Sequence, residues 1–197
     1  GAVTGQRVQQ YPGGARGRAR EIEDGAHRPA AELLADLRAA AAALEHDWHA
    51  LPERGWGLMT TTLVARRPVS QGVLARWREV EVHHVDLAVG YGPADWPAGF
   101  VAVFLPRTIR SLPGRAQDVP DGYRWCLHDE TSGTSWRVTA AAVTAGHGPA
   151  DAPDAEISAA GWQLLAWLLG RGNGGIRTKH TDDTGTALRL PEFFPFA

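Results

Sequence analysis

The sequence REVEVHHVDL, residues 78–87, places Glu79, His83 and Asp86 at positions i, i+4 and i+7 of a predicted helix. Side chains with this spacing lie along one stripe of a helix. A carboxylate and an imidazole one turn apart are natural ligands for a divalent transition metal. The stretch therefore predicts a helix and makes its stripe a candidate for part of a metal site.

Helical periodicity extends on both sides of this stretch. The helix with the metal stripe is predicted over about 69–90, with Ser70 as N-cap and Gly90 as the stop. An earlier helix is predicted over 29–51, and a later one over about 97–112. Apolar residues of the earlier helix recur at helical spacing and are expected to form a buried stripe: Leu33, Leu34, Leu37, Ala41 and Leu44.

Two segments between these helices lack helical periodicity. Residues 1–28 are rich in Gly, Arg and Gln and contain little to bury, which predicts an extended or loop segment. Residues 56–67 contain Thr and Val and are expected to be extended.

The pattern changes after Gly114. Residues 123–130 and 134–143 alternate as two strands do, around a turn at Ser132 and Gly133. The strongly apolar run 157–171 predicts one more helix.

This order of elements predicts an α+β fold. Helices come first and strands with one helix follow, so we expect a helical metal-binding domain over 1–113 and a small α/β domain over 114–197. The net charge of −2 gives no reason to expect nucleic acid or membrane partners. A single cysteine, Cys126, excludes an internal disulfide and favours a cytoplasmic location; its strand-like context indicates a core residue rather than a catalytic thiol.

A longer run around the metal stripe resembles a known family. REVEVHHVDLAVGYGPADWP, residues 78–97, is similar to mycothiol-dependent maleylpyruvate isomerases, above all in the E-V-x-x-H-x-x-D-L core. Weaker similarity extends to TGQRVQQYPGGARGRAREIE (4–23), PAAELLADLR (29–38) and AWLLGR (166–171). The resemblance implies a DinB-like helical bundle with a small C-terminal α/β domain, a divalent metal, expected to be zinc, and mycothiol as thiol cosubstrate.

The metal stripe has a functional and a plain interpretation. An isolated E-x-x-x-H pattern is typical of an exposed helix face with a weak Glu–His pair, whereas the resemblance implies that Glu79 and His83 are metal ligands. Asp86 is expected to orient the imidazole from behind, and an ordinary helix carboxylate is the alternative. His84 lies about 100° around the helix from His83, which favours a packing role.

Arg171 closes the apolar helix in AWLLGR. By itself it is a cation that suits the end of a helix dipole. The resemblance implies an arginine from the second domain that binds an anionic substrate or stabilises developing negative charge. Arg171 is the position matched to this catalytic role and Arg137 is the alternative; the planar guanidinium can bond both oxygens of a carboxylate.

The resemblance also implies a third ligand, a histidine on an earlier helix. Residues 1–28 match the loop that follows that helix, so we expect this chain to lack the first helices of the bundle. The exposed apolar faces are then expected to be covered in a homo-oligomer or by a separate N-terminal segment. A two-ligand site binds metal weakly, so low activity is expected of the chain alone.

Two functions follow from these features. The first is a metal-dependent isomerase or S-transferase, in which a thiolate adds to an electrophilic or anionic small molecule such as maleylpyruvate, and rotation and elimination give the trans isomer. The second is a non-catalytic family member that acts as a binding or interaction module. The missing third ligand favours the second function, and the retained Glu79, His83 and Asp86 favour the first.

Overall fold

The computed structural model describes residues 11–61, 66–113, 124–139, 141–146, 153–172 and 174–180. The chain forms two compact units, Gly1–Trp77 and Arg78–Ala197, which are described separately below. This division lies within one helix and differs from the predicted domain boundary at 113.

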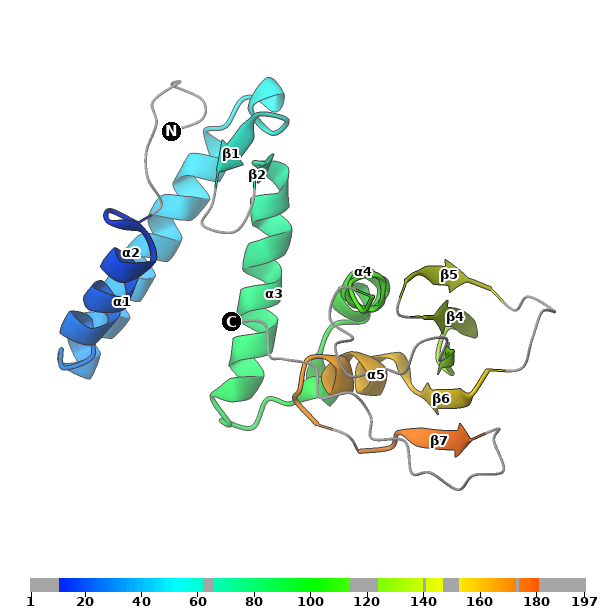
Figure 1. The fold of residues 1–197 in the computed structure, drawn as a ribbon. Helices are drawn as coiled ribbons and strands as arrows, with labels where there is room; N and C mark the ends of the chain where they lie inside the picture. The colour runs from blue at the N-terminus through cyan, green and yellow to red at the C-terminus, as the bar shows by residue number, and fades with distance from the viewer. Residues whose placement is uncertain are drawn as a thin grey trace. The chain divides into compact units, whose positions relative to one another are not determined.

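The first unit consists of helices and one small hairpin (Figure 1). Its strands β1 (Met59–Thr61) and β2 (Arg66–Pro68) pair antiparallel, as the extended pattern of 56–67 predicted. The elements that precede and follow this hairpin are α1 (Gly14–Gly25), α2 (Ala30–His49), the 3-10 turn η2 (Glu53–Gly55) and the first residues of α3 (Ser70–Asp86).

Helix α1 contradicts the predicted loop over 1–28. Its sequence GARGRAREIEDG contains Ala, Arg and Glu, which are strong helix formers, between two glycines at its ends. Only Gly17 is buried, so almost none of this helix is covered by other residues. Gly17 is required because a Cβ there would lie 1.8 Å from the carbonyl oxygen of Pro12. Residues 1–10 lie outside the described part of the chain.

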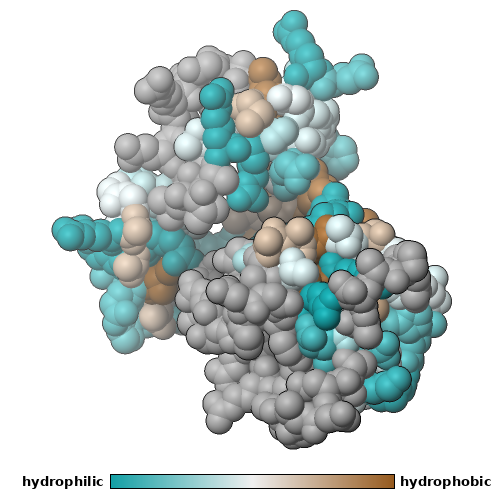
Figure 2. All heavy atoms as spheres, turned by 45° about the vertical axis from the view of Figure 1, so that its right-hand side comes forward, coloured by the Kyte–Doolittle hydropathy of each residue, from teal (hydrophilic) through white to brown (hydrophobic). Residues whose placement is uncertain are grey.

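Helix α2 has the predicted helical spacing, but its apolar stripe is not buried. In the described structure none of its 20 residues is buried. Leu33, Leu34 and Leu37 are 41%, 46% and 57% exposed. Periodicity predicts which face of a helix is apolar, whereas burial also needs a second surface to cover that face. Figure 2 shows brown, hydrophobic side chains at the molecular surface.

The second unit is a mixed sheet with helices packed on it (Figure 1). The sheet has the order β5-β4-β3-β6-β7, in which β3 and β6 are parallel and the other neighbours are antiparallel. The strands are β3 (Trp125–Asp129), β4 (Thr134–Val138), β5 (Val143–Ala145), β6 (Ala155–Ala159) and β7 (Arg177–His180). The helical parts are the rest of α3, η3 (Pro93–Asp95), α4 (Ala98–Arg110) and α5 (Gly161–Leu168).

The buried residues of this unit come mainly from the sheet and from helices α4 and α5. Alternate residues of β3 are buried, and Leu127 pairs in register with the buried Ile157 of β6. Phe100 and Ile109 of α4 and Leu165 of α5 are fully buried. Helix α4 packs against α5, so it belongs with the strands that follow it in sequence.

The predicted α+β fold is confirmed, but a second element, besides α1, differs from its prediction. The apolar run 157–171 was expected to be a single helix, whereas its first residues belong to β6 and only Gly161–Leu168 is helical. The A-x-I-x-A pattern of β6 pairs with β3, which is about thirty residues earlier, and this non-local pairing outweighs the local helical pattern. In the described residues no helix is long and apolar enough to cross a membrane.

Candidate metal centre

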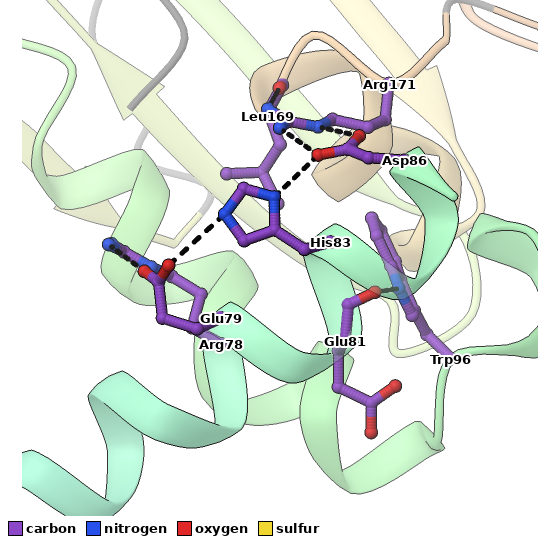
Figure 3. Close-up of polar contacts among 8 residues, drawn as sticks. All are labelled: Arg78, Glu79, Glu81, His83, Asp86, Trp96, Leu169 and Arg171. Carbon is purple, nitrogen blue, oxygen red and sulfur yellow. Dashed lines mark hydrogen bonds and ion pairs between the residues drawn. The ribbon is translucent and has the colours of Figure 1, made fainter. Parts of the chain in front are cut away.

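Helix α3 brings Glu79 and His83 together as the i, i+4 spacing predicts. The Glu79 Oε2 atom lies 3.2 Å from His83 Nε2 (Figure 3). The two side chains are 48% and 58% exposed, so a ligand can reach them from solvent.

The imidazole ring of His83 lies between two carboxylates. A neutral imidazole carries one N–H and can donate to only one carboxylate. In His83 both ring nitrogens lie near a carboxylate oxygen, Nδ1 at 2.8 Å from Asp86 Oδ2 and Nε2 at 3.2 Å from Glu79. When Nδ1 donates to Asp86, Nε2 and the Glu79 oxygen are two acceptors that face each other. In that tautomer, a divalent metal ion between the two atoms could accept a lone pair from each.

The pair also fits the size of a metal ion. Two ligand atoms on a tetrahedral zinc ion, with bonds of about 2.0–2.1 Å, lie roughly 3.3 Å apart. The distance of 3.2 Å between Glu79 and His83 agrees with this separation. Glu79 and His83 therefore fit a divalent metal as two of its ligands.

Asp86 lies on the other edge of the imidazole ring and does not complete a ligand set. Its Oδ2 atom contacts Nδ1, the nitrogen that points away from Glu79. Such a carboxylate fixes the tautomer and the orientation of a metal-binding histidine. Among the residues that the structure describes, no group of three or more His, Cys, Asp or Glu side chains could hold a metal ion.

Arg171 contacts Asp86 with both sides of its guanidinium. Nε donates to Oδ1 at 3.0 Å and Nη2 donates to Oδ2 at 2.8 Å, while Nη1 donates to the Leu169 carbonyl at 2.6 Å (Figure 3). The hydrogen bond from Arg171 is the largest cause that lowers the pKa of Asp86, and His83 lowers it further against the effect of burial. The predicted anion-binding role of Arg171 stays a prediction, as do the ligand roles of Glu79 and His83.

On another face of α3, two aromatic side chains bond Glu81, and the sequence did not predict this group of contacts. The Trp96 indole donates to the Glu81 carbonyl at 3.1 Å, and the Tyr91 hydroxyl donates to the Glu81 carboxylate at 2.6 Å. Trp96 is buried and packs on Phe100, so it is a core residue. Burial and the Glu81 carboxylate raise the pKa of Tyr91 to about 12. Both residues that bond Glu81 lie in the sequence YGPADW, residues 91–96.

Two other histidines, His84 and His49, have contacts of their own. His84 stacks on Tyr91 with 3.9 Å between ring centroids, in agreement with the predicted packing role. His49 Nδ1 lies 2.9 Å from the Glu45 carbonyl of its own helix. Arg78, which was not predicted, lies beside the pair, with Nη2 3.5 Å from Glu79 Oε1.

Residues 1–88 match a protein family described as the mycothiol maleylpyruvate isomerase N-terminal domain. Among solved structures, the crystal structure of the mycothiol-dependent maleylpyruvate isomerase matches with a TM-score of 0.76 and 23% sequence identity. The match covers 99% of this chain and 72% of that chain. The structure of a histidine-to-alanine mutant of that isomerase gives the same values. The comparison with curated proteins finds no match.

These comparisons agree with the geometry on two points. At 23% identity the structural match shows a shared fold, which spans both compact units. The family match ends at residue 88, directly after α3, and so includes Glu79, His83 and Asp86. Over residues 1–88, this chain is similar to the mycothiol maleylpyruvate isomerase N-terminal domain family.

Proposed function

We propose that this protein is a metal-dependent enzyme that activates a small thiol. The thiol either catalyses the isomerisation of an electrophilic small molecule or is transferred onto it. The observation that carries the proposal is the 3.2 Å distance between Glu79 Oε2 and His83 Nε2, which are both acceptors when His83 Nδ1 donates to Asp86. The family match of residues 1–88, which include both residues, supports a metal ion at this position.

Each residue of the centre has a distinct task in this proposal. Glu79 and His83 hold the ion, and Asp86 keeps the proton of the imidazole on Nδ1 so that Nε2 is free to bind metal. A bound divalent ion would lower the pKa of a coordinated thiol, so that thiolate forms near neutral pH. Zinc is the expected ion, because one imidazole and one carboxylate are ligands that it commonly takes.

The thiol and the substrate are proposed from the similar structure. The isomerase that shares this fold is mycothiol-dependent and is named for maleylpyruvate. We infer that mycothiol is the thiol, and that the substrate is an electrophilic or anionic small molecule of the same class. The exposed position of Glu79 and His83 leaves room for both.

The test is a rate measurement with zinc-loaded protein, mycothiol and maleylpyruvate. We expect isomerisation that depends on mycothiol and that falls to background in Glu79→Gln and His83→Ala. A simple electrophile such as a chlorinated aromatic compound, assayed for mycothiol consumption, distinguishes an S-transferase from an isomerase. Absence of any mycothiol-dependent reaction with either substrate, in protein that holds zinc, would contradict the proposal.

One observation favours a second candidate, a non-catalytic binding module. In the described part of the chain no third side chain joins Glu79 and His83 in a group that could hold a metal. Metal analysis separates the two candidates, because a module without a working site purifies with a zinc stoichiometry near zero and does not take up zinc on reconstitution. A homo-oligomer or a separate segment that supplies the third ligand is proposed for the enzyme, and an increase of zinc affinity with protein concentration would support the oligomer.

A further inference from the structure

A chain of contacts leads from helix α5 to the candidate metal ligand His83. Arg171 bonds both oxygens of Asp86, and the same Oδ2 atom that accepts from Arg171 lies 2.8 Å from His83 Nδ1. The side chain of Arg171 is 14% exposed, that of Asp86 37% and that of His83 58%. This series of contacts therefore begins at the nearly buried Arg171 side chain and ends at the solvent-exposed imidazole of His83.

Arg171 is itself held firmly by the end of α5. Gly170 adopts the left-handed conformation with φ 71°, and its N–H bonds the Trp167 carbonyl at 3.0 Å. The N–H of Arg171 bonds the Ala166 carbonyl at 2.8 Å, which completes a Schellman motif. Because Nη1 also donates to the Leu169 carbonyl, both the backbone and the side chain of Arg171 are fixed by its own turn.

Asp86, in contrast, is poorly placed without a cation. It is the last residue of α3, where the partial negative charge of the helix dipole disfavours a carboxylate. After it the chain leaves the helix, and Ala88 has a positive φ of 53°, which is rare for a residue with a Cβ. A bidentate arginine offsets the unfavourable charge and fixes both oxygens of the carboxylate.

We propose that Arg171 is a positioning residue that holds Asp86, and through Asp86 the imidazole of His83, in the orientation a metal ligand needs. The proposal rests on the proposed function only for the ligand role of His83. It differs from substrate binding, because three of the five N–H donors of Arg171 point at Asp86 and at the Leu169 carbonyl.

The test uses the full-length, metal-free protein labelled with ¹⁵N-histidine, at pH 8.5. We expect the ring nitrogens of His83 to report a single tautomer with the proton on Nδ1, and a shift towards the Nε2–H tautomer in Arg171→Ala. Arg171→Lys keeps the charge but loses the planar fork, so it should restore the tautomer only in part. The matched control is Arg177→Ala, which removes an exposed arginine paired with Glu130.

A second readout is zinc affinity, measured by competition with a chelator. Loss of such an outer partner typically weakens metal binding 10–100-fold, so we expect about a tenfold loss in Arg171→Ala and none in the control. In an Asp86→Asn background, Arg171→Ala should cause no further change in either readout, because Arg171 acts through Asp86. Partial recovery of zinc affinity in Arg171→Lys, and an unchanged thermal melt of Arg171→Ala, distinguish a loss of positioning from a loss of folding.

The outcomes separate this inference from the proposed function. An unchanged His83 tautomer in folded Arg171→Ala, or an equal effect with Asp86→Asn present, would overturn the positioning role. If the tautomer shifts as expected while no variant and no wild-type protein binds zinc, the positioning role stands and the proposed function fails. A variant that only raises the KM for an anionic substrate, with tautomer and zinc affinity unchanged, would make Arg171 a substrate-binding residue instead.

Discussion

Helix α5 is followed by the turn that holds Arg171, and at its first residue Gly161 meets the carboxylate of Asp129 in the sheet. A Cβ at position 161 would lie 2.8 Å from Asp129 Oδ2, about 0.6 Å short of the 3.4 Å at which ordinary contact begins. Asp129 is buried and cannot easily withdraw, since Oδ1 accepts from the Thr131 N–H at 2.9 Å and Oδ2 from the Ser132 hydroxyl at 2.6 Å. Gly161→Ala should therefore force a shift at this junction.

The expected magnitude follows from two opposing effects. Overpacking a tight site costs about 1–3 kcal/mol. Replacing a helical glycine with alanine returns about 0.5–1 kcal/mol of backbone entropy and helix propensity. We expect Gly161→Ala to lower the free energy of unfolding by about 1–2 kcal/mol, which for a unit of this size lowers Tm by roughly 4–8 °C.

The assay is urea and thermal unfolding, with Gly72→Ala as the matched control. Gly72 is also helical, but a Cβ at that position would meet no atom within 4 Å, so its substitution should not destabilise the protein. In an Asp129→Ala background the clash is absent, and Gly161→Ala should then cost nothing. Unchanged stability of Gly161→Ala, or the same loss with and without Asp129, would refute the reasoning.

Four further predictions concern single residues of the second unit. Gly170→Ala should cost about 1–2 kcal/mol in urea unfolding because φ is 71°, and an unchanged midpoint would contradict this. Trp96→Phe loses the bond to the Glu81 carbonyl and should cost about 1 kcal/mol with an unchanged m value. The pKa of Tyr91 in the folded protein is raised to about 12, so its contribution to the free energy of unfolding is complete below pH 10 and is lost between pH 10 and 12. In Tyr91→Phe, the free energy of unfolding should fall less over this pH range. Burial raises the pKa of the Cys126 thiol, so alkylation at pH 8 should be slower than in the urea-unfolded chain, and equal rates would argue against it.

The parts of this protein that sequence predicts best are those set by short-range geometry. The contact between Glu79 and His83 follows from an i, i+4 spacing within one helix, and the hairpin of β3 and β4 follows from two alternating runs around a turn. Resemblance to a family added Arg171 to the candidate residues. It did not supply the partner of Arg171, because the contact with Asp86 joins elements that only the folded second unit brings together.

The errors have equally specific physical causes. Residues 157–159 look helical beside the apolar run that follows, yet they pair with β3 because a long-range ladder buries Ile157. Residues 14–25 form a helix that their glycine and charge content concealed. The stripe that includes Leu37 has the expected spacing but is exposed, because spacing does not say what covers a face.

The most direct test of the metal centre is the zinc affinity of four proteins, measured by chelator competition after adventitious metal has been removed. These are the wild type, Glu79→Gln, His83→Ala and the matched control His84→Ala, which removes the neighbouring histidine that stacks on Tyr91. If Glu79 and His83 are metal ligands, the wild type binds zinc specifically and His84→Ala keeps its zinc affinity. Glu79→Gln and His83→Ala each lower the zinc affinity roughly tenfold or more. Equal, weak binding by all four proteins would contradict a metal centre on this helix.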